Sequence, residues 1–507
     1  MKNKYIFISV VCLMFIQSYK SPISLTDKSE SKPNIIYILA DDLGYGDLSS
    51  FNPNGKIKTP HLDELASQGM KFTDAHTSSS VCTPTRYGIL TGRYNWRTRL
   101  KQGVLNGRST ALIPKERSTV ASILKSSGYE TAFIGKWHLG WDWPKNEDNH
   151  IDFSLPVVNS PNDLGFEYAY GHSGSLDMPP YVYVENTIPT SIPTDTTVNK
   201  GKYTWWRKGL TAPDFVHEDV TPNFFRRGMD FIEQQASAKN PFFLYLPLPS
   251  PHTPILPSKD WYGKSGLNPY ADFIMMIDHY VGQLLSVVEN SGIEEDTLII
   301  FTSDNGCSPE ADFEELALKG HHPSHHFRGH KADIFEGGHR VPFIAKWPAV
   351  IDAGTINDQV ICTTDFMATC AEIIGYPLED DQAEDSFSLF PLFQQKSYNR
   401  SAVVHHSING SFAIRKGDWK LIMCPDSGGW SYPNPRRDKE AIDSLPPIQL
   451  YNLKDDVAES ENLQAKYPQI VKELQEILTK QILNGRSTKG EVQPNDTGNE
   501  WRHLWWI

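Results

Sequence analysis

Residues 34–42 have the sequence Asn-Ile-Ile-Tyr-Ile-Leu-Ala-Asp-Asp, an apolar run that ends in two carboxylates. The run is continuous rather than alternating, so it predicts a β-strand at residues 34–40 that is buried on both faces. Strands of this kind belong to parallel sheets that helices cover on both sides. The stretch therefore predicts an α/β fold, with Asp41 and Asp42 at the carboxyl end of a strand.

Three further runs have the same apolar character, and helical patterns lie between the runs. The predicted strands cover residues 131–135, 242–246 and 297–302. The predicted helices cover residues 60–68, 118–127 and 270–290. Strands that alternate with helices indicate a large, mostly parallel sheet flanked by helices.

Polar side chains follow all four predicted strands. They are Asp41 and Asp42, Lys136 and His138, His252, and Asp304 and Asn305. In open α/β sheets the ligand crevice lies just outside the carboxyl ends of the strands. We therefore expect four separate strands to deliver polar groups to one crevice.

The length and the later composition predict more than one domain. A chain of 507 residues corresponds to about three domain equivalents. A large α/β domain is expected over residues 30–385, followed by a smaller C-terminal α+β subdomain with a tail over residues 386–507. Antiparallel strands and one helix are predicted there, at residues 402–406, 411–415, 419–423 and 464–482. From the 140s to Thr211 the chain is rich in Pro, Tyr and Trp, which is typical of irregular surface loops.

The first 20 residues are expected to be a cleaved signal peptide. Lys2 and Lys4 flank the start of the apolar run 5–16, which at about 12 residues is too short to span a bilayer. Export to the periplasm or the medium, without an integral membrane anchor, is therefore expected.

Charge and cysteine content exclude several classes. Lys and Arg number 48 and Asp and Glu 61, a net charge of −13, which argues against a nucleic-acid-binding protein because phosphates require a basic face. Any anionic ligand must meet a local cluster of positive charge. Six cysteines are too few for a disulfide scaffold, and the sequence leaves open how Cys307, Cys362, Cys370 and Cys424 pair.

Residues 81–93 read Val-Cys-Thr-Pro-Thr-Arg-Tyr-Gly-Ile-Leu-Thr-Gly-Arg. A loop with an incidental cysteine is the alternative for any single cysteine. The Cys-x-Pro-x-Arg spacing followed by Leu-Thr-Gly-Arg, however, resembles the signature of the type I sulfatases, members of the alkaline-phosphatase superfamily. The Gly-Lys-Trp-His segment at 135–138 and the Glu-Gly-Gly-His-Arg-Val-Pro segment at 336–342 are similar to the same family, so the resemblance extends over most of the chain.

The resemblance implies that Cys82 is oxidised to formylglycine (3-oxoalanine) by a formylglycine-generating or anaerobic sulfatase-maturating enzyme. The hydrated aldehyde is a geminal diol. One hydroxyl attacks sulfur, and deprotonation of the other expels sulfate and restores the aldehyde. An ordinary serine would instead leave a sulfate ester that water removes slowly.

The polar groups at the strand ends suit a hard cation. Asp41 and Asp42 alone would more often be a turn or a helix cap. With Asp304 and Asn305 they supply three carboxylates and one amide oxygen, which favours Ca²⁺ first and Mg²⁺ second, with modified Cys82 in the same site. The two-zinc and phosphonate-cleaving relatives are similar to one another in having an Asp-His pair where this sequence has Asp304 and Asn305. By this resemblance, Asn305 favours one metal ion and a sulfate ester.

The resemblance also implies catalytic roles for other residues. Arg86, Lys136 and Lys331 would bind the anion and so supply the local positive charge. His138 would accept the diol proton, and His252 would protonate the leaving alcohol. From the residues alone, solvated side chains or a structural histidine are as plausible.

Substrate contacts are predicted in two loops. The segment Gly-His-Ser-Gly-Ser-Leu-Asp at 171–177 is similar to the loop on the sugar side of carbohydrate sulfatases, which implies contacts from His172, Ser175 and Asp177. His326 and His330, from a histidine-rich segment, are further predicted contacts.

Three functions remain open at this point. The first is a secreted, calcium-dependent sulfatase that acts on a sulfated carbohydrate such as ulvan, carrageenan or a glycosaminoglycan. The second is a phosphate or phosphonate ester hydrolase of the same superfamily, and the third is a non-catalytic glycan-binding homologue. The intact cysteine, lysines and histidines favour the first.

Overall fold

The predicted strand at residues 34–40 forms β1, Asn34–Asp41, in the computed structural model, which apart from Met1 describes residues 32–507. β1 pairs in parallel with β10 (Phe242–Pro251) on one side and with β11 (Thr297–Ser303) on the other. β4 (Glu130–Lys136) pairs in parallel with the far side of β10. The four predicted strands are therefore neighbours, and their carboxyl ends lie along one edge of the sheet.

The full sheet has ten strands and is mixed, in the order β13-β2-β12-β11-β1-β10-β4-β5-β6-β7. β5 (Tyr168–His172) continues the parallel part beyond β4, and β12 (Phe343–Lys346) is antiparallel to β11. The other strands of this sheet are β2 (Met70–Phe72), β6 (Val184–Glu185), β7 (Ile188–Pro189) and β13 (Thr355–Asn357). A second, two-stranded sheet consists of β3 (Ala75–His76) and β14 (Ile361–Cys362).

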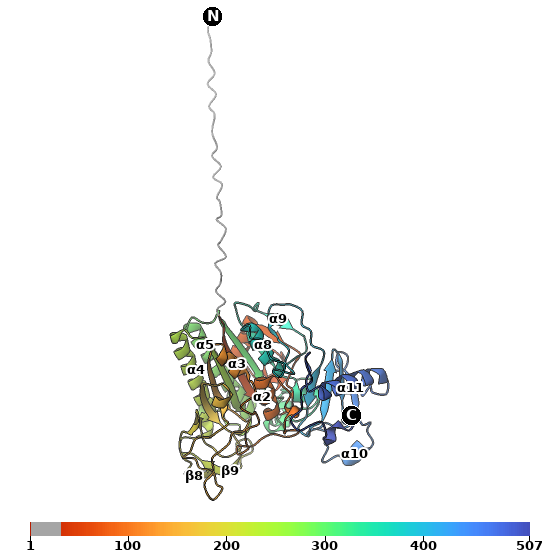
Figure 1. Ribbon diagram of the computed structural model, residues 1–507, viewed down its shortest axis with the longest axis horizontal. Coiled ribbons are helices and arrows are strands. Elements are labelled where there is room, and N and C mark those ends of the chain that lie inside the picture. Colours follow the sequence, from red (N-terminus) through yellow and green to blue (C-terminus); the bar gives the residue numbers. More distant parts are fainter. Residues whose placement is uncertain (2–31) are drawn as a thin grey trace. The chain divides into compact units, whose positions relative to one another are not determined.

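Helices cover the large sheet in two groups, which lie on either side of the strands in Figure 1. One group packs together through α5 and consists of α1 (Pro60–Gln68), α4 (Val220–Ala238) and α5 (Pro269–Asn290). The other consists of α2 (Cys82–Thr91), α3 (Val120–Ser126) and α8 (Phe366–Ile373). The predicted α/β architecture is thus confirmed. The remaining short helices are α6 (Phe313–Leu318), α7 (Glu336–His339), α9 (Phe390–Phe393) and α10 (Lys439–Asp443).

The prediction of irregular loops from the 140s to Thr211 is wrong in part. It contains β5 to β7 and a hairpin of β8 (Asp195–Asn199) and β9 (Trp206–Thr211), labelled in Figure 1. β5 reads Tyr-Ala-Tyr-Gly-His and has no β-branched residue, so composition alone does not indicate a strand. It forms because β4 offers it a buried parallel edge.

The C-terminal part builds a separate antiparallel sheet, as predicted. Its order is β15 (Val403–His406), β16 (Phe412–Lys416), β17 (Trp419–Ile422) and β18 (Gln449–Asn452). Helix α11 (Pro468–Leu483) covers one face through Leu474, Leu478 and Ile482. The domain boundary near Asp385 stays a prediction.

The predicted signal peptide, residues 1–20, lies outside the described residues apart from Met1. Within residues 32–507, none of the helices combines the length and the apolar character needed to cross a membrane.

A buried ionic cluster joins the small sheet to the large domain. Lys420 of β17 places its Nζ 3.0 Å from Glu336 Oε1 and 2.8 Å from Glu459 Oε1, and all three side chains are fully buried. Removing one member of such a cluster leaves uncompensated charge in the interior.

We expect Lys420→Met to lower the free energy of unfolding by about 3–5 kcal/mol, because Glu336 and Glu459 lose the ammonium group between them. Lys416→Met is the matched control. Its ion pair with Glu473 is exposed, so the expected loss is below about 1 kcal/mol. Denaturant titration measures both variants, and equal losses would contradict the structural role of Lys420.

Candidate active site

Three carboxylates meet where β1 and β11 end. One oxygen each from Asp41, Asp42 and Asp304 lies within 4.8 Å of the others, and all three side chains are buried. Asn305 joins them, since its Nδ2 donates to Asp42 Oδ1 at 2.7 Å. The structure therefore brings the four predicted oxygen ligands into one cluster.

The cluster fits a divalent cation. Asp41 Oδ1 and Asn305 Oδ1 are buried and have no hydrogen-bond partner among the described residues. Buried oxygens without partners are costly, and carboxylate and amide oxygens are the ligands that Ca²⁺ and Mg²⁺ prefer. Burial, together with the Asp41 carboxylate, raises the pKa of Asp304 to about 6.

The backbone at Asp42 is held in an unusual conformation. Its φ is 65°, a left-handed value that costs a residue other than glycine about 1–3 kcal/mol unless its surroundings impose it. The Tyr270 hydroxyl lies 3.1 Å from the Asp42 carbonyl oxygen and 2.5 Å from Asp47 Oδ2. Neither supporting residue was predicted from the sequence. Asp47 is a further carboxylate only five residues after Asp42, and this closeness in sequence could have indicated it. Tyr270, by contrast, cannot be distinguished in the sequence from a core residue of α5.

Two lysines contact these carboxylates. Lys136, at the end of β4, ion-pairs with Asp41 and donates to Ser175 Oγ at 3.0 Å. Lys331 Nζ donates to Asp42 Oδ2 at 2.7 Å. Burial disfavours the Lys331 ammonium, but Asp42 outweighs this effect and raises its pKa, so the side chain stays charged.

Arg86 contacts two of the carboxylates through its guanidinium group. Its Nε and Nη2 donate to Asp304 Oδ2 at 3.0 and 2.8 Å, and Nη2 is 3.2 Å from Asp41 Oδ2. Its Nη1 donates to the carbonyl oxygen of Lys136 at 3.0 Å. These contacts position the carboxylate cluster, and the anion contact that the resemblance implies for Arg86 stays a prediction.

Cys82 is the first residue of α2 and only 2% exposed. Its Sγ, one Asp41 oxygen and one His252 nitrogen lie within 4.8 Å of one another. Burial raises the pKa of the Cys82 thiol to about 12 despite the nearby Lys136. Because the thiolate is the reactive form, an unmodified thiol here is a poor nucleophile.

The two predicted acid–base histidines are held in defined tautomers. His138 Nε2 donates to the Leu105 carbonyl at 2.8 Å, so Nδ1, which is buried and has no partner among residues 32–507, carries the lone pair. Burial and Lys136 hold the pKa of His138 well below its usual range, which favours the neutral, proton-accepting form. His252 Nδ1 donates to the Thr253 carbonyl at 2.6 Å, and its Nε2 lies 3.7 Å from Asp42 Oδ2.

The predicted sugar-side loop lies against the cluster. Ser175 Oγ is 3.3 Å from His252 Nε2, and Asp177 ion-pairs with Arg207 of β9. His172 ends β5 with a buried Nε2 that has no partner among the described residues, and burial lowers its pKa to about 3. Arg207 was not predicted from the sequence, because the hairpin that carries it was not expected.

The histidine-rich segment contributes less than predicted. His330 Nδ1 donates to the carbonyl oxygen of Lys331 at 2.9 Å, so it borders the site. His326 is exposed, and its ring packs against His325 and Phe327. In the described part of the chain it makes no hydrogen bond to the cluster, so the structure does not place it with the other predicted residues.

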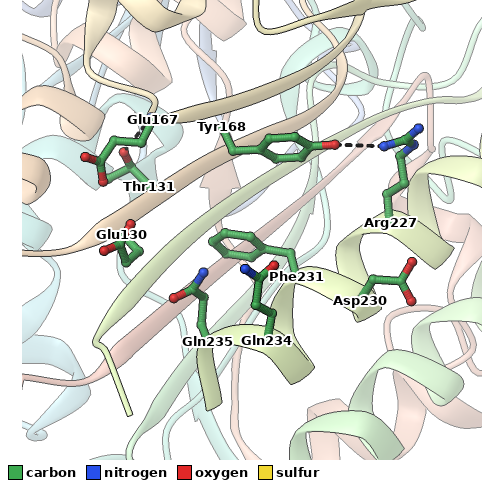
Figure 2. Close-up of a pocket in the computed structure, with 9 residues that line it drawn as sticks. All are labelled: Glu130, Thr131, Glu167, Tyr168, Arg227, Asp230, Phe231, Gln234 and Gln235. Carbon is green, nitrogen blue, oxygen red and sulfur yellow. Dashed lines mark hydrogen bonds between the residues drawn. The ribbon is translucent and has the colours of Figure 1, made fainter. Parts of the chain in front are cut away.

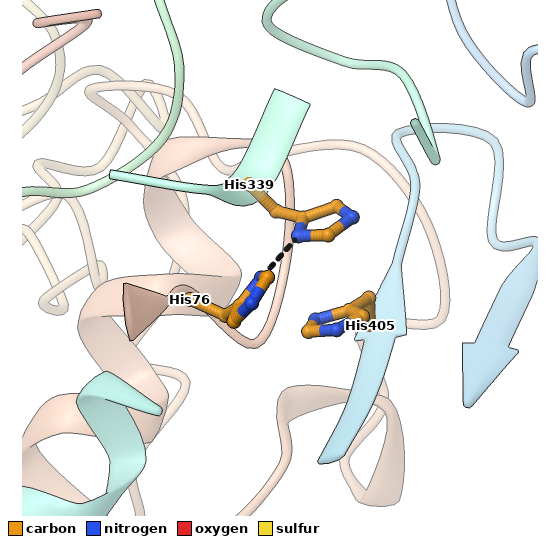
Figure 3. Close-up of side chains that lie close together, drawn as sticks. All are labelled: His76, His339 and His405. Carbon is orange, nitrogen blue, oxygen red and sulfur yellow. Dashed lines mark hydrogen bonds between the residues drawn. The ribbon is translucent and has the colours of Figure 1, made fainter. Parts of the chain in front are cut away.

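A second group of buried histidines does not form a comparable metal site. His76, His339 and His405 have ring nitrogens within 4.8 Å of one another (Figure 3). The rings of His339 and His405, however, are stacked, with centroids 3.9 Å apart and an angle of 11° between the ring planes. Their in-plane lone pairs therefore cannot converge on one ion. Lys420 Nζ, 3.0 Å from His339 Nε2, adds positive charge. The group belongs to the junction between the sheets.

Comparisons with known proteins point to one family. The sulfatase family model matches residues 33–376. The chain is 33% identical to the N-acetylgalactosamine-6-O-sulfatase of Bacteroides thetaiotaomicron, covering 89% of this chain and 93% of that relative. It is 31% identical to human arylsulfatase A, and the match covers 91% of this chain and 90% of that relative. A solved structure from Bacteroides thetaiotaomicron, described under the metabolism of multiple glycosaminoglycans, superposes with a TM-score of 0.78 at 32% identity, covering 89% of this chain and 99% of that one.

Proposed function

Because the chain belongs to the sulfatase family and is a sulfuric ester hydrolase, we propose that it removes sulfate from a glycosaminoglycan-type carbohydrate, with a 6-sulfated hexosamine or galactose unit as the reacting residue. The relative named for N-acetylgalactosamine-6-O-sulfatase activity, matched over 89% of this chain, supports this substrate class. The observation that carries the proposal is Cys82 beside Asp41 and His252 at the edge of a buried carboxylate cluster.

We propose that Asp41, Asp42, Asp304 and Asn305 hold one Ca²⁺ ion, and modified Cys82 completes the site. When bound, the ion would supply Lewis acidity to a sulfate oxygen and to the nucleophile. Arg86 positions Asp304 and Asp41 for this task. The Asp41 and Asn305 oxygens that have no hydrogen-bond partner in the described part of the chain support the assignment.

The nucleophile is proposed to be the hydrated aldehyde of formylglycine, made from Cys82 by a separate maturating enzyme. It would supply one hydroxyl for attack on sulfur and a second whose deprotonation releases sulfate and restores the aldehyde. The raised pKa of the Cys82 thiol supports a modified side chain over thiol chemistry, because the unmodified group would stay protonated at neutral pH.

The chain's own residues handle the protons and the charge. His252, as an imidazolium, directs the proton on Nε2 to the leaving alcohol, while His138 offers Nδ1 to the proton of the diol. Lys136 and Lys331 bind the sulfate oxygens. They meet the requirement of a local positive cluster in a chain of net charge −13.

His172, Ser175 and Asp177 are proposed to contact the sugar, with His330 at the border of the site. Arg207 holds Asp177 and so positions its carboxylate. The predicted export through residues 1–20 would bring the enzyme to an extracellular or periplasmic polymer, without a need for a membrane anchor.

We expect His252→Ala to lower kcat for a 6-sulfated sugar by about 10²–10⁴-fold, but to lower it far less for 4-nitrophenyl sulfate. Nitrophenolate is a good leaving group and needs little protonation, whereas a sugar alkoxide needs a proton. Steady-state kinetics on both substrates measures the difference. Equal losses on the two would count against the acid role of His252.

His150→Ala, at an exposed histidine, is the matched control and should leave both rates unchanged. The same assay includes phosphate and phosphonate monoesters. Faster turnover of these esters than of sulfate esters would favour the phosphohydrolase alternative. No turnover by protein carrying modified Cys82 would favour a glycan-binding homologue.

A further inference from the structure

We propose that a basic cavity beside the active site binds a second anionic group of the same oligosaccharide. The cavity has a volume of about 640 Å³ and is lined by residues from four separate segments of the chain. The residues that matter here are Gly103, Ile408, Asn409, Arg436, Lys439 and Arg502. This inference rests on the proposed carbohydrate sulfatase function and narrows its substrate to a chain of more than one sugar unit.

The charge of the cavity is its first distinguishing feature. Among the residues that the structure describes, its lining includes Arg436, Lys439 and Arg502 and no carboxylate. Within residues 32–507, none of the three has a carboxylate oxygen within 4.0 Å, although the chain as a whole carries 13 more acidic than basic groups. Three uncompensated cations around one hollow repel one another, and a bound anion removes that repulsion.

Two walls of the cavity connect directly to the active site. Gly103 lies two residues before Leu105, which corresponds to at most about 7 Å along the chain. The Leu105 carbonyl in turn accepts a hydrogen bond from His138 Nε2. Ile408 donates its backbone N–H to the Ala332 carbonyl at 3.1 Å, next to Lys331. Gly103 and Ile408 are themselves joined by a backbone hydrogen bond of 2.8 Å.

The third wall comes from a segment that contacts the active-site loop. The Trp430 backbone N–H donates to Asp333 Oδ1 at 2.7 Å, two residues after Lys331. Trp430 and Tyr432 on this segment are 42% and 67% exposed, and Arg436 follows four residues later. Exposed aromatic rings beside cations form a surface suited to sugar rings that carry anions.

The chemistry favours a sulfate or a carboxylate on a neighbouring sugar. Arginine guanidinium groups bind such planar or tetrahedral oxyanions through paired N–H donors. An aryl sulfate or a singly sulfated monosaccharide that places its one sulfate at Cys82 has no second anionic group for the cavity. The site therefore assigns the substrate to sulfated oligosaccharides or polysaccharides with an anion on the next unit.

The hollow shown in Figure 2 contrasts with this cavity. It is lined by Glu130, Glu167 and Asp230, with Arg227 as its one basic residue. Glu130 begins β4, whereas Lys136 ends it, so this hollow lies at the opposite edge of the sheet from the active site. Its acidic lining is unsuited to a sulfated chain.

The test is the triple variant Arg436→Ala/Lys439→Ala/Arg502→Ala, in enzyme whose Cys82 is matured. The probes are a 6-sulfated chondroitin tetrasaccharide, N-acetylgalactosamine 6-sulfate and 4-nitrophenyl sulfate. We expect KM for the tetrasaccharide to rise at least about tenfold with kcat unchanged, because charge-assisted hydrogen bonds are lost. The dependence of the tetrasaccharide KM on salt should also weaken. KM and kcat for the two small substrates should stay the same.

The matched control is Lys264→Ala/Lys454→Ala/Lys472→Ala, which removes three exposed lysines elsewhere and should not change KM. An unchanged tetrasaccharide KM in the cavity variant would overturn the inference while leaving the sulfatase function intact. Failure of the matured wild-type enzyme to release sulfate from any probe would instead overturn the proposed function.

A carboxyl-reduced tetrasaccharide that keeps its sulfates identifies the anion. If the cavity variant still raises KM for this probe, the bound group is a sulfate. If the effect disappears, the bound group is the uronate carboxylate. Either result supports an anion site at Arg436, Lys439 and Arg502.

Discussion

Cys82→Ala is expected to lower kcat/KM for every sulfate ester by at least about 10⁴-fold. In the proposed mechanism, the side chain at position 82 supplies both the attacking oxygen and the hydroxyl that releases sulfate. Alanine can supply neither. The remaining groups, Lys136, Lys331 and the carboxylate cluster, would still bind the anion, so the affinity for a sulfated oligosaccharide should stay within a few-fold.

Cys370→Ala is the matched control for this loss. Cys370 is also a buried free cysteine, but it lies in α8 and outside the cluster. Its replacement should lower stability by only about 1–2 kcal/mol and leave activity unchanged. Near-wild-type turnover by Cys82→Ala, or a collapse of activity in both variants, would contradict the assignment of the nucleophile.

Chelation is expected to have the second-largest effect. Incubation with EDTA should lower activity by about 10²-fold or more, and Ca²⁺ should restore it better than Zn²⁺. Asp41, Asp42, Asp304 and Asn305 offer oxygen atoms alone, whereas zinc favours nitrogen and sulfur donors. Kinetic titration of the metal-free enzyme with each ion measures the preference.

A stability measurement checks the metal site without relying on turnover. At Ca²⁺ about 100-fold above its Kd, the free energy of unfolding should rise by about 2.7 kcal/mol, visible as an increase in Tm. Asn305→Ala should weaken this increase, and Asp230→Asn, an acidic residue of the distant hollow in Figure 2, should not. Restoration by Zn²⁺ alone would point to the phosphohydrolase alternative.

The fold was largely predictable because its central strands are buried on both faces. Such strands occur in the sequence as continuous apolar runs, and all four predicted runs are neighbours in one sheet. The polar residues that follow them converge for the same reason, since parallel strands end at one edge. The proximity of Asp41 and Asp304, 263 residues apart in the chain, therefore follows from the sequence pattern alone.

Features that depend on tertiary contacts could not be predicted. β5 lacks the composition of a strand and is specified by its pairing with β4. The partners of Arg86 and Asp177 lie 218 and 30 residues away in sequence, on elements whose packing sets the contacts. The modification of Cys82 came from the resemblance, because no spacing or charge reveals an oxidised side chain.

Peptide mass spectrometry of position 82 tests the central claim most directly. Trypsin cleaves after Lys71 and Arg86, so one peptide, residues 72–86, contains Cys82 and no other cysteine. For active enzyme we predict that this peptide has the mass of an aldehyde in place of the thiol and reacts with hydroxylamine. Fully active enzyme whose peptide carries only an unmodified thiol, blocked by iodoacetamide, would contradict the account.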